Sequence, residues 1–463
     1  MDFSWRAWLA TAFALFACAW VSERACARDG DVVLPFGARL VIPPSGSFYP
    51  LGVCVDSANR VLLSGYRYVD PAPPGGKDYF AARLLPNGAA DPDFGTAGQV
   101  QIPFDVAGGN DDIGTRCAMQ GDKPVITGTV ETTPAGFDFG LLRLDEDGTP
   151  DDGFGIDGEL TVAIDDGGST DLAVAILVQP DQKIVVAGEA YTATGNLAAV
   201  ARLMPDGARD NAFDLDGRVS IAFAPGDPAE ASFAESVAED SLGRIIVAGA
   251  SAHDFAIARL TPDGALDPTF NGSGTTTVAF DLAGDGIDQA EGVLAQSDGK
   301  IVAAGYACSG GTPGCSTEDV ALVRLNADGS LDASFGQGGR RVISLDRGGS
   351  NVDRAYAILQ QPDGKLLVIG TVTTSDTDAD AFVLRLRADG SLDPGFGTNG
   401  VAIHGNDGFG DLADIPLSAV LLASGEIVIG GIAQFGAPPA TYGFAMRIAS
   451  GDDIFTDGLD PPL

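Results

Sequence analysis

The chain repeats a unit of about 60 residues along most of its length, and this period restricts the fold more than any other feature. One marker of the unit is a glycine that ends a basic-then-apolar run, and it occurs seven times, at Gly65, Gly128, Gly188, Gly249, Gly305, Gly370 and Gly431. A second marker is an arginine within an apolar segment, at Arg83, Arg143, Arg202, Arg259, Arg324, Arg385 and Arg447. Markers at a fixed spacing predict an array of equivalent structural units.

Each unit contains four short apolar segments. In the sixth unit they cover residues 355–359, 365–370, 381–387 and 401–404. These segments are rich in Val, Ile, Leu and Phe and are bounded by Gly, Asp, Asn and Pro, as is typical of β-strands. Asp-Gly pairs at 363–364 and 389–390 supply the positive φ that a tight hairpin turn needs. We therefore expect neighbouring segments to pair antiparallel.

Seven units of four antiparallel strands predict an all-β fold, a seven-bladed β-propeller over residues 28–450. A right-handed β-solenoid is the main alternative, but its parallel coils would not need a hairpin turn in every unit. The seventh unit stops after its third strand, at 444–448, and residues 32–44 resemble a fourth strand. We expect this N-terminal strand to complete the last blade and to close the ring.

The units resemble the bacterial delta-60 repeat, as in DFAIARLTPDGALDPTFNGSGTTTVAFD at 254–281 and VLAQSDGKIVAAG at 293–305. The resemblance extends over nearly all of the chain after residue 27. It implies an exported, propeller-like repeat protein. It implies little about activity, because that family is described by its repeat and not by a reaction.

The first 27 residues have the features of a secretory signal peptide. Arg6 precedes an apolar run at 7–21, and Ala25-Cys26-Ala27 predicts cleavage after Ala27. Acylation of Cys18, as in a lipoprotein, is the alternative. The tail at 451–463 leaves the repeat pattern and resembles a short ending of some exported Gram-negative proteins. We expect a secreted, periplasmic or cell-surface protein of a Gram-negative bacterium.

The net charge of −37 opposes binding to nucleic acid and to anionic lipid. We expect no integral membrane segment after the signal peptide is removed, and a monomer. The chain contains no GxSxG, HExxH or CxxC motif, and its two histidines lie in different units. These absences favour a binding protein over an enzyme.

Four cysteines follow the predicted cleavage site. Cys308 and Cys315 flank a Gly- and Pro-containing insertion, and we expect a local disulfide between them. Cys54 and Cys117 each lie eleven residues before a marker glycine, where other units have Leu or Val. This position favours buried free thiols, with a disulfide between the first two units as the alternative.

An aspartate recurs seventeen residues before the marker glycine in five units, at Asp111, Asp171, Asp288, Asp353 and Asp414. These residues enter the innermost strands, so their carboxylates could ring the mouth of the channel and bind Ca²⁺. In the alternative interpretation each aspartate caps its own loop by accepting backbone N–H groups. For the repeated arginine we expect a structural salt bridge to a turn aspartate.

Three functions are compatible with these patterns. The first is an exported binding or scaffold propeller that holds a glycan, peptide or protein ligand on the face with the variable loops, with help from Ca²⁺. The second is a carbohydrate-active hydrolase or lyase with a carboxylate pair near the channel. The third is a structural cell-surface protein. The absence of a catalytic motif favours the first.

Overall fold

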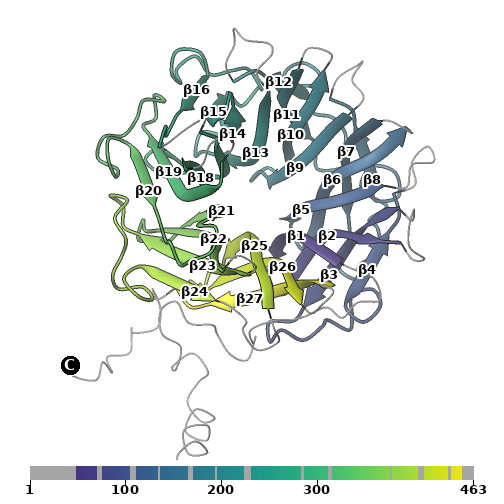
Figure 1. Cartoon of the computed structure of the whole chain (residues 1–463). Coiled ribbons are helices and arrows are strands. Elements are labelled where there is room, and N and C mark those ends of the chain that lie inside the picture. Colours follow the sequence, from purple (N-terminus) through teal and green to yellow (C-terminus); the bar gives the residue numbers. More distant parts are fainter. Residues whose placement is uncertain are drawn as a thin grey trace, which may run out of the picture.

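A computed structural model describes residues 48–69, 76–104, 111–133, 136–164, 170–192, 195–223, 231–282, 286–310, 315–375, 378–404, 411–435 and 440–450. In these residues all the regular structure is β-strand, and the sheets are arranged in a ring around a central axis (Figure 1). The predicted signal peptide, the strand expected at 32–44 and the tail at 451–463 lie outside the described residues.

Each repeat contributes strands in the same order, from the axis outward. The innermost strands are β1 (Phe48–Val55), β5 (Asp112–Gln120), β9 (Thr170–Val178), β13 (Ser232–Glu239), β17 (Asp288–Ala295), β21 (Asp353–Gln360) and β25 (Asp411–Leu421). The second strands are β2 (Val61–Tyr68), β6 (Lys123–Thr133), β10 (Ile184–Thr192), β14 (Ile245–Ser251), β18 (Ile301–Gly310), β22 (Leu366–Ser375) and β26 (Ile427–Phe435).

The third strands are β3 (Lys77–Leu84), β7 (Gly136–Arg143), β11 (Gly195–Leu203), β15 (Asp254–Leu260), β19 (Thr317–Leu325), β23 (Asp378–Leu386) and β27 (Ala440–Ile448). The outermost strands are only four residues long: β4 (Gln99–Ile102), β8 (Glu159–Val162), β12 (Arg218–Ile221), β16 (Thr275–Val278), β20 (Arg340–Ile343) and β24 (Val401–His404). Short outer strands limit the exposed edge of each sheet.

The described strands form six hydrogen-bonded sheets, where the sequence predicted seven. Four sheets have four antiparallel strands, one has eight, and the last, β25–β27, has three. The eight-stranded sheet arises because Phe137 of β7 and Thr170 of β9 form one parallel pair that links two neighbouring four-stranded units. No described helix is long and apolar enough to cross a membrane.

The hydrophobic core lies between neighbouring sheets. One cluster joins Phe255 of β15 to Ile301 of β18, and a second joins Phe48 of β1 to Val428 of β26 and Ala445 of β27. The second cluster brings the first described sheet onto the last one. The ring is therefore closed among the described residues (Figure 1).

The repeated arginine makes the same buried contacts in six repeats. Its Nε donates to the turn aspartate at 2.6 to 2.9 Å, in the pairs Arg83–Asp91, Arg143–Asp151, Arg202–Asp210, Arg259–Asp267, Arg324–Asp332 and Arg385–Asp393. The guanidinium also lies 4.5 to 5.0 Å from the centre of the turn phenylalanine ring. The predicted structural salt bridge is confirmed.

In six repeats the same arginine also bonds to the next repeat around the ring. Its Nη1 donates to a turn carbonyl of the following repeat, in the pairs Arg143–Pro205, Arg202–Pro262, Arg259–Ala327, Arg324–Ala388 and Arg385–Ser450. Arg447 of the last repeat donates in the same way to Pro86 of the first, at 3.1 Å. The junction that closes the ring therefore has the same bond as these five junctions.

Two disulfides are present in the described part of the chain. Cys308 and Cys315 are bonded as predicted. Cys54 and Cys117 are bonded as well, so the preference for free thiols was wrong. These cysteines lie on β1 and β5, which pack side by side, and their Cα atoms are 5.8 Å apart. The shared sequence position placed both residues in the core but did not show that adjacent innermost strands come this close.

Removal of the two disulfides should affect stability unequally. The Cys54–Cys117 bond spans 63 residues and the Cys308–Cys315 bond spans 7, so the first restricts the unfolded chain more. We expect the double variant Cys54→Ala/Cys117→Ala to lose about 4 kcal/mol of unfolding free energy and Cys308→Ala/Cys315→Ala about 2 kcal/mol. Urea unfolding of the full chain measures both, and an equal or reversed order would contradict this prediction.

Candidate axial binding site

The innermost strand of each repeat carries a β-bulge opposite the marker glycine. In β17 the register shifts between Ala290 and Gly292, so Glu291 is an extra residue. A Cβ atom on Gly305 of β18 would lie 1.9 Å from the carbonyl oxygen of Gln289. The two backbones approach so closely here that a side chain at the marker position has no room.

The same arrangement recurs around the ring. A Cβ on any of the seven marker glycines would lie 1.9 to 2.1 Å from a carbonyl oxygen of the innermost strand. The bulged positions are held by Leu51, Arg116, Val174, Glu235, Glu291, Tyr356 and Leu417, and in β5 the bulge includes Thr115 as well. We call these seven side chains the collar.

A cavity of about 390 Å³ lies on the axis. Five collar residues border it, namely Arg116, Glu235, Glu291, Tyr356 and Leu417. The rest of its wall comes from residues that follow the bulges, and it combines polar groups with apolar side chains such as Val53, Met119, Ile176, Val237, Val293, Ile358 and Val420. The cavity therefore occupies the half of the channel nearer to the turns between the first and second strands.

The acidic part of the collar comes from two neighbouring repeats. Gln289 lies between Glu235 and Glu291, and its Nε2 donates to one oxygen of each carboxyl at 3.1 Å. Those two oxygens are therefore no more than about 6 Å apart. The Tyr306 hydroxyl donates to Oε1 of Gln289 at 3.1 Å and so fixes the orientation of the amide.

Both acids titrate near neutral pH. Burial raises the pKa of the Glu235 carboxyl to about 8, and the negative charges of Glu291 and Glu189 add to this effect. Burial raises the pKa of Glu291 to about 7, although Arg116 and Arg354 oppose the shift. Because the two charges repel each other, the pair retains a proton at pH values where an exposed glutamate has lost it.

The two nearby arginines, Arg116 and Arg354, donate their hydrogen bonds to other acceptors. Arg116 donates through Nη1 to the carbonyl oxygens of Leu51 and Leu417, the latter at 2.6 Å. Arg354 binds both carboxylate oxygens of Glu318, and its guanidinium lies 4.4 Å from the centre of the Tyr306 ring. Among the described residues, neither arginine forms an ion pair with Glu235 or Glu291.

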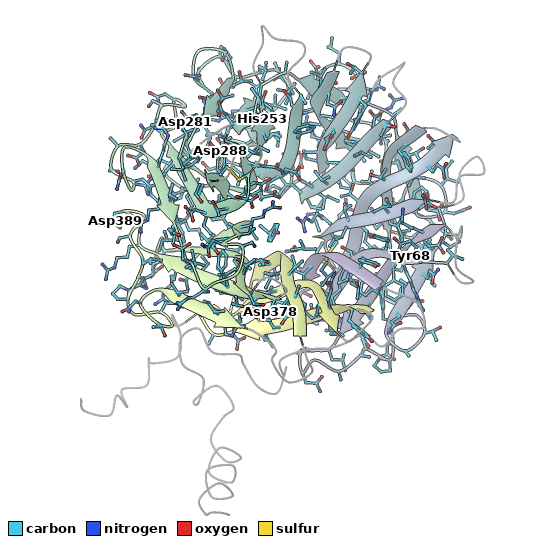
Figure 2. The ribbon with its side chains drawn as sticks, viewed as in Figure 1. Tyr68, His253, Asp281, Asp288, Asp378 and Asp389 are labelled. Atoms are coloured by element: carbon cyan, nitrogen blue, oxygen red, sulfur yellow. A yellow bond between two sulfur atoms is a disulfide. The ribbon has the colours of Figure 1, made fainter. Side chains whose placement is uncertain are left out.

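The predicted calcium ligands cap the loops that precede the innermost strands. Their Oδ2 atoms accept a backbone N–H at 2.7 Å in three repeats, from Ile164 to Asp171, Phe280 to Asp288 and Leu345 to Asp353. Asp288 also donates through its own N–H to the carbonyl of His253, at 2.6 Å (Figure 2). Asp414 is buried at the corresponding place in β25.

In the second repeat this position belongs to Asp112 and not to Asp111. Asp112 is buried and accepts the Phe104 N–H at 3.1 Å, whereas Asp111 is partly exposed and lies 3.5 Å from Lys77 Nζ. The longer bulge of β5 shifts the count by one residue. In Asp112 and Asp288 both carboxylate oxygens accept backbone N–H groups, and calcium binding by this column stays a prediction.

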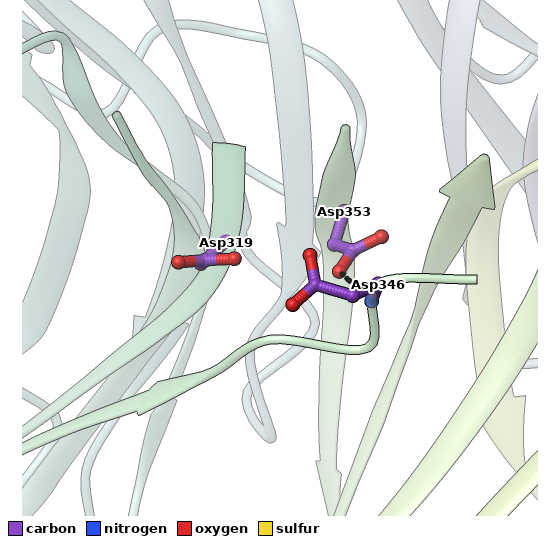
Figure 3. A group of neighbouring side chains, drawn as sticks. All are labelled: Asp319, Asp346 and Asp353. Carbon is purple, nitrogen blue, oxygen red and sulfur yellow. Dashed lines mark hydrogen bonds between the residues drawn. The ribbon is translucent and has the colours of Figure 1, made fainter. Parts of the chain in front are cut away.

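Asp353 has two further carboxylates close by. Asp319, Asp346 and Asp353 each place an oxygen within 4.8 Å of the other two (Figure 3). Burial raises the pKa of Asp353 to about 6, and repulsion from Asp319 and Asp346 adds to the shift, while the Leu345 and Asp346 N–H groups oppose it. Carboxylate oxygens are the ligands that Ca²⁺ prefers, but hydrogen bonding within the group explains part of its geometry.

The collar was not identified from the sequence, although a signal exists. Six of its seven residues lie fourteen positions before a marker glycine, and only the longer bulge of β5 departs from this spacing. The side chains in this column are apolar, acidic, basic and aromatic, so the column has no common chemistry. Without knowledge of the bulge, nothing indicated that these side chains meet at the axis.

Comparison with known proteins supports a β-propeller repeat family. Residues 179–213, 243–270, 296–335 and 361–396 match a family described as a domain of unknown function (DUF5122) β-propeller. Each matched segment ends at the phenylalanine of a turn. The name delta-60 remains a resemblance. No curated protein sequence matches the chain.

Several solved structures have a similar arrangement at low identity. The polysaccharide lyase Uly1 has 9% identity and a TM-score of 0.46, over 89% of this chain and 91% of that one. The α-L-arabinofuranosidase Arb93A from Fusarium graminearum has 8% identity and a TM-score of 0.47, over 90% and 99%. An α-L-arabinanase from Penicillium chrysogenum has 10% and 0.43, over 89% and 98%. At these values no functional conclusion follows.

The marker glycine gives a direct test of the bulge. In Gly305→Ala the new Cβ would meet the Gln289 carbonyl, so the strands must separate, and we expect a loss of about 3 kcal/mol of unfolding free energy. Gly299→Ala in the same repeat is the control, because its φ of +84° costs only about 1 kcal/mol for alanine and its Cβ is not crowded. Equal losses in urea unfolding would contradict the close approach.

The acid pair predicts a pH dependence of stability. Because the folded pKa values are about 8 and 7, above the ordinary glutamate value of 4.5, the stability from this pair is complete below pH 4.5 and is lost as pH rises to 8. The double variant Glu235→Gln/Glu291→Gln should therefore gain stability relative to the wild type as the pH rises from 5 to 9.

Urea unfolding at pH 5, 7 and 9 measures this difference. Asp152→Asn is the control, because Asp152 is exposed and the substitution removes the same kind of charge. The difference in unfolding free energy between the double variant and the wild type should grow with pH. The difference between the control and the wild type should stay constant. A constant difference for the double variant would show that the two carboxyls titrate normally.

Proposed function

We propose that this protein is an exported seven-bladed propeller that binds its ligand in the axial cavity and has no catalytic activity. The blade count treats the eight-stranded sheet as two blades, because a single residue pair joins its halves. Seven marker glycines and seven bulges support that count. Residues 32–44 would complete the three-stranded last blade.

The observation that carries the proposal is the axial cavity and its collar. Ligand sites in proteins are concave and mainly apolar, with a few convergent polar groups and perturbed pKa values. The cavity has a volume of about 390 Å³, apolar side chains in part of its wall and two titratable acids at one end. No other feature of the described residues combines these properties.

The position of Gln289 favours binding over hydrolysis. In a retaining glycosidase two carboxyls about 5 to 5.5 Å apart hold the sugar carbon between them. Here the Gln289 amide lies between the carboxyls and donates to both, so the place of the reacting carbon is taken. The acid pair is therefore better arranged to hold a ligand at the cavity end than to cleave a glycosidic bond.

Export is supported by the two disulfides, because such bonds persist in oxidising compartments. The proposed secretory signal peptide at residues 1–27 fits the same route. The periplasm, the cell surface and the external medium all meet this condition. Glycans and peptides are the ligands that such a protein would encounter.

Arrays of glycans and peptides, probed with the full chain, test this function. For a ligand found on an array, we expect Tyr356→Ala at the cavity to weaken binding about tenfold, as titration calorimetry would measure. Tyr68→Ala is the control, because Tyr68 is an exposed aromatic residue at the end of β2 (Figure 2). The reverse order would place the site on the loops, and release of cleaved product would establish an enzyme.

A further inference from the structure

The acid pair is the least compensated charged group in the collar. The direct hydrogen-bond partner of both Glu235 and Glu291 is the uncharged amide of Gln289. Glu189 adds a third negative charge nearby, and its Oε2 is buried without a hydrogen-bond partner. Arg116 and Arg354 favour the charged form of Glu291 from a distance, but neither arginine is hydrogen-bonded to the acids, and a buried acid is normally stabilised by such a direct partner.

The charged groups around the pair form their hydrogen bonds with other partners. Arg116 of β5 donates to two backbone carbonyls, and Arg354 of β21 is held by Glu318 of β19. Tyr306 of β18 donates to Gln289, and Tyr356 of β21 borders the cavity. The described elements around the pair therefore offer neither acid a direct cation.

The cavity beyond the acids has apolar side chains in its wall. Its wall there contains Val237, Val293 and Ile358, with Met119 and Val53 from other repeats. A ligand that enters this space would place an apolar body against the wall and one end against the acids. Burial of the apolar body would stabilise the complex, because apolar surface leaves water.

We infer that the axial cavity selects ligands with an ammonium group on an apolar body, and that the ammonium group is held by Glu235 and Glu291. The inference rests on the proposed function and names the ligand class of the same site. A primary ammonium group donates up to three hydrogen bonds, enough for one oxygen from each acid. The protein's net charge of −37 would also attract a cation from solution.

Proton release should accompany the binding of such a ligand. A cation beside the two carboxyls lowers their pKa values, so the complex holds fewer protons than the free protein near pH 7. The charges of Arg116, Arg354, Glu318 and Glu189 contribute to the starting pKa values of the pair, and the uncharged Tyr306 and Tyr356 lie close by. A neutral ligand of the same shape would release no proton.

Three small probes of equal length test the inference: hexylammonium, 1-hexanol and hexanoate. Titration calorimetry of the full chain at pH 7 should give at least about tenfold tighter binding of hexylammonium than of 1-hexanol, and the weakest binding of hexanoate. Repeating the titration in buffers of different ionisation enthalpy measures the released protons.

Variants separate this inference from the proposed function. In the double variant Glu235→Gln/Glu291→Gln, hexylammonium should bind no better than 1-hexanol and should release no proton. Asp152→Asn is the charge-matched control and should bind all three probes as the wild type does. Equal binding of hexylammonium and 1-hexanol by the wild type would overturn the ammonium inference and leave the cavity as a binding site. Failure of every probe to bind would overturn the axial site itself.

Discussion

The contact between the marker glycine and the carbonyl oxygen of the innermost strand determines how each sheet meets the axis. A Cβ added at the marker position would lie 1.9 to 2.1 Å from that oxygen, so the second strand must have glycine there. Because no side chain stands in the way, the innermost strand can bulge toward the second strand. The bulge turns one extra side chain per repeat toward the channel. A single backbone constraint, repeated seven times, thus produces both the regular scaffold and the one ring of positions where the repeats differ chemically.

The outer half of the repeat holds its own turn and the neighbouring repeat in place. There the arginine binds the turn aspartate, stacks on the turn phenylalanine and donates to a carbonyl of the next repeat. A buried guanidinium with five donors can satisfy all of these partners only if the turns of two repeats are in register. The arginine therefore recurs because it stabilises the contact between repeats. The collar residues differ from repeat to repeat, so the chemistry of the channel can vary without a change in the scaffold.

The period, the strand pattern and the turn chemistry could be predicted because each follows from local residue preferences. The predicted strands of the sixth repeat, for example, match β21 to β24 within a few residues, except that β22 and β23 extend into their connecting loop. The collar could not be predicted, because a bulge changes which side chain faces the axis and a simple alternating pattern does not reveal it. The same extra residue moved the capping role from Asp111 to Asp112. The Cys54–Cys117 bond depends on the packing of two repeats, which neither repeat shows by itself.

The closing junction has a mechanical consequence. Arg447 and Pro86 join the last repeat to the first with the bond used elsewhere, and a hydrophobic cluster spans the same boundary. A linear stack of repeats can fray from its ends at little cost. A closed ring has no terminal repeat that can unfold first. Where the arginine bond crosses a boundary, opening that boundary leaves a guanidinium and a carbonyl without their partners. The lifetime of the folded state is therefore set by the weakest boundary in the circle, and once that boundary gives way the rest should follow in one cooperative event.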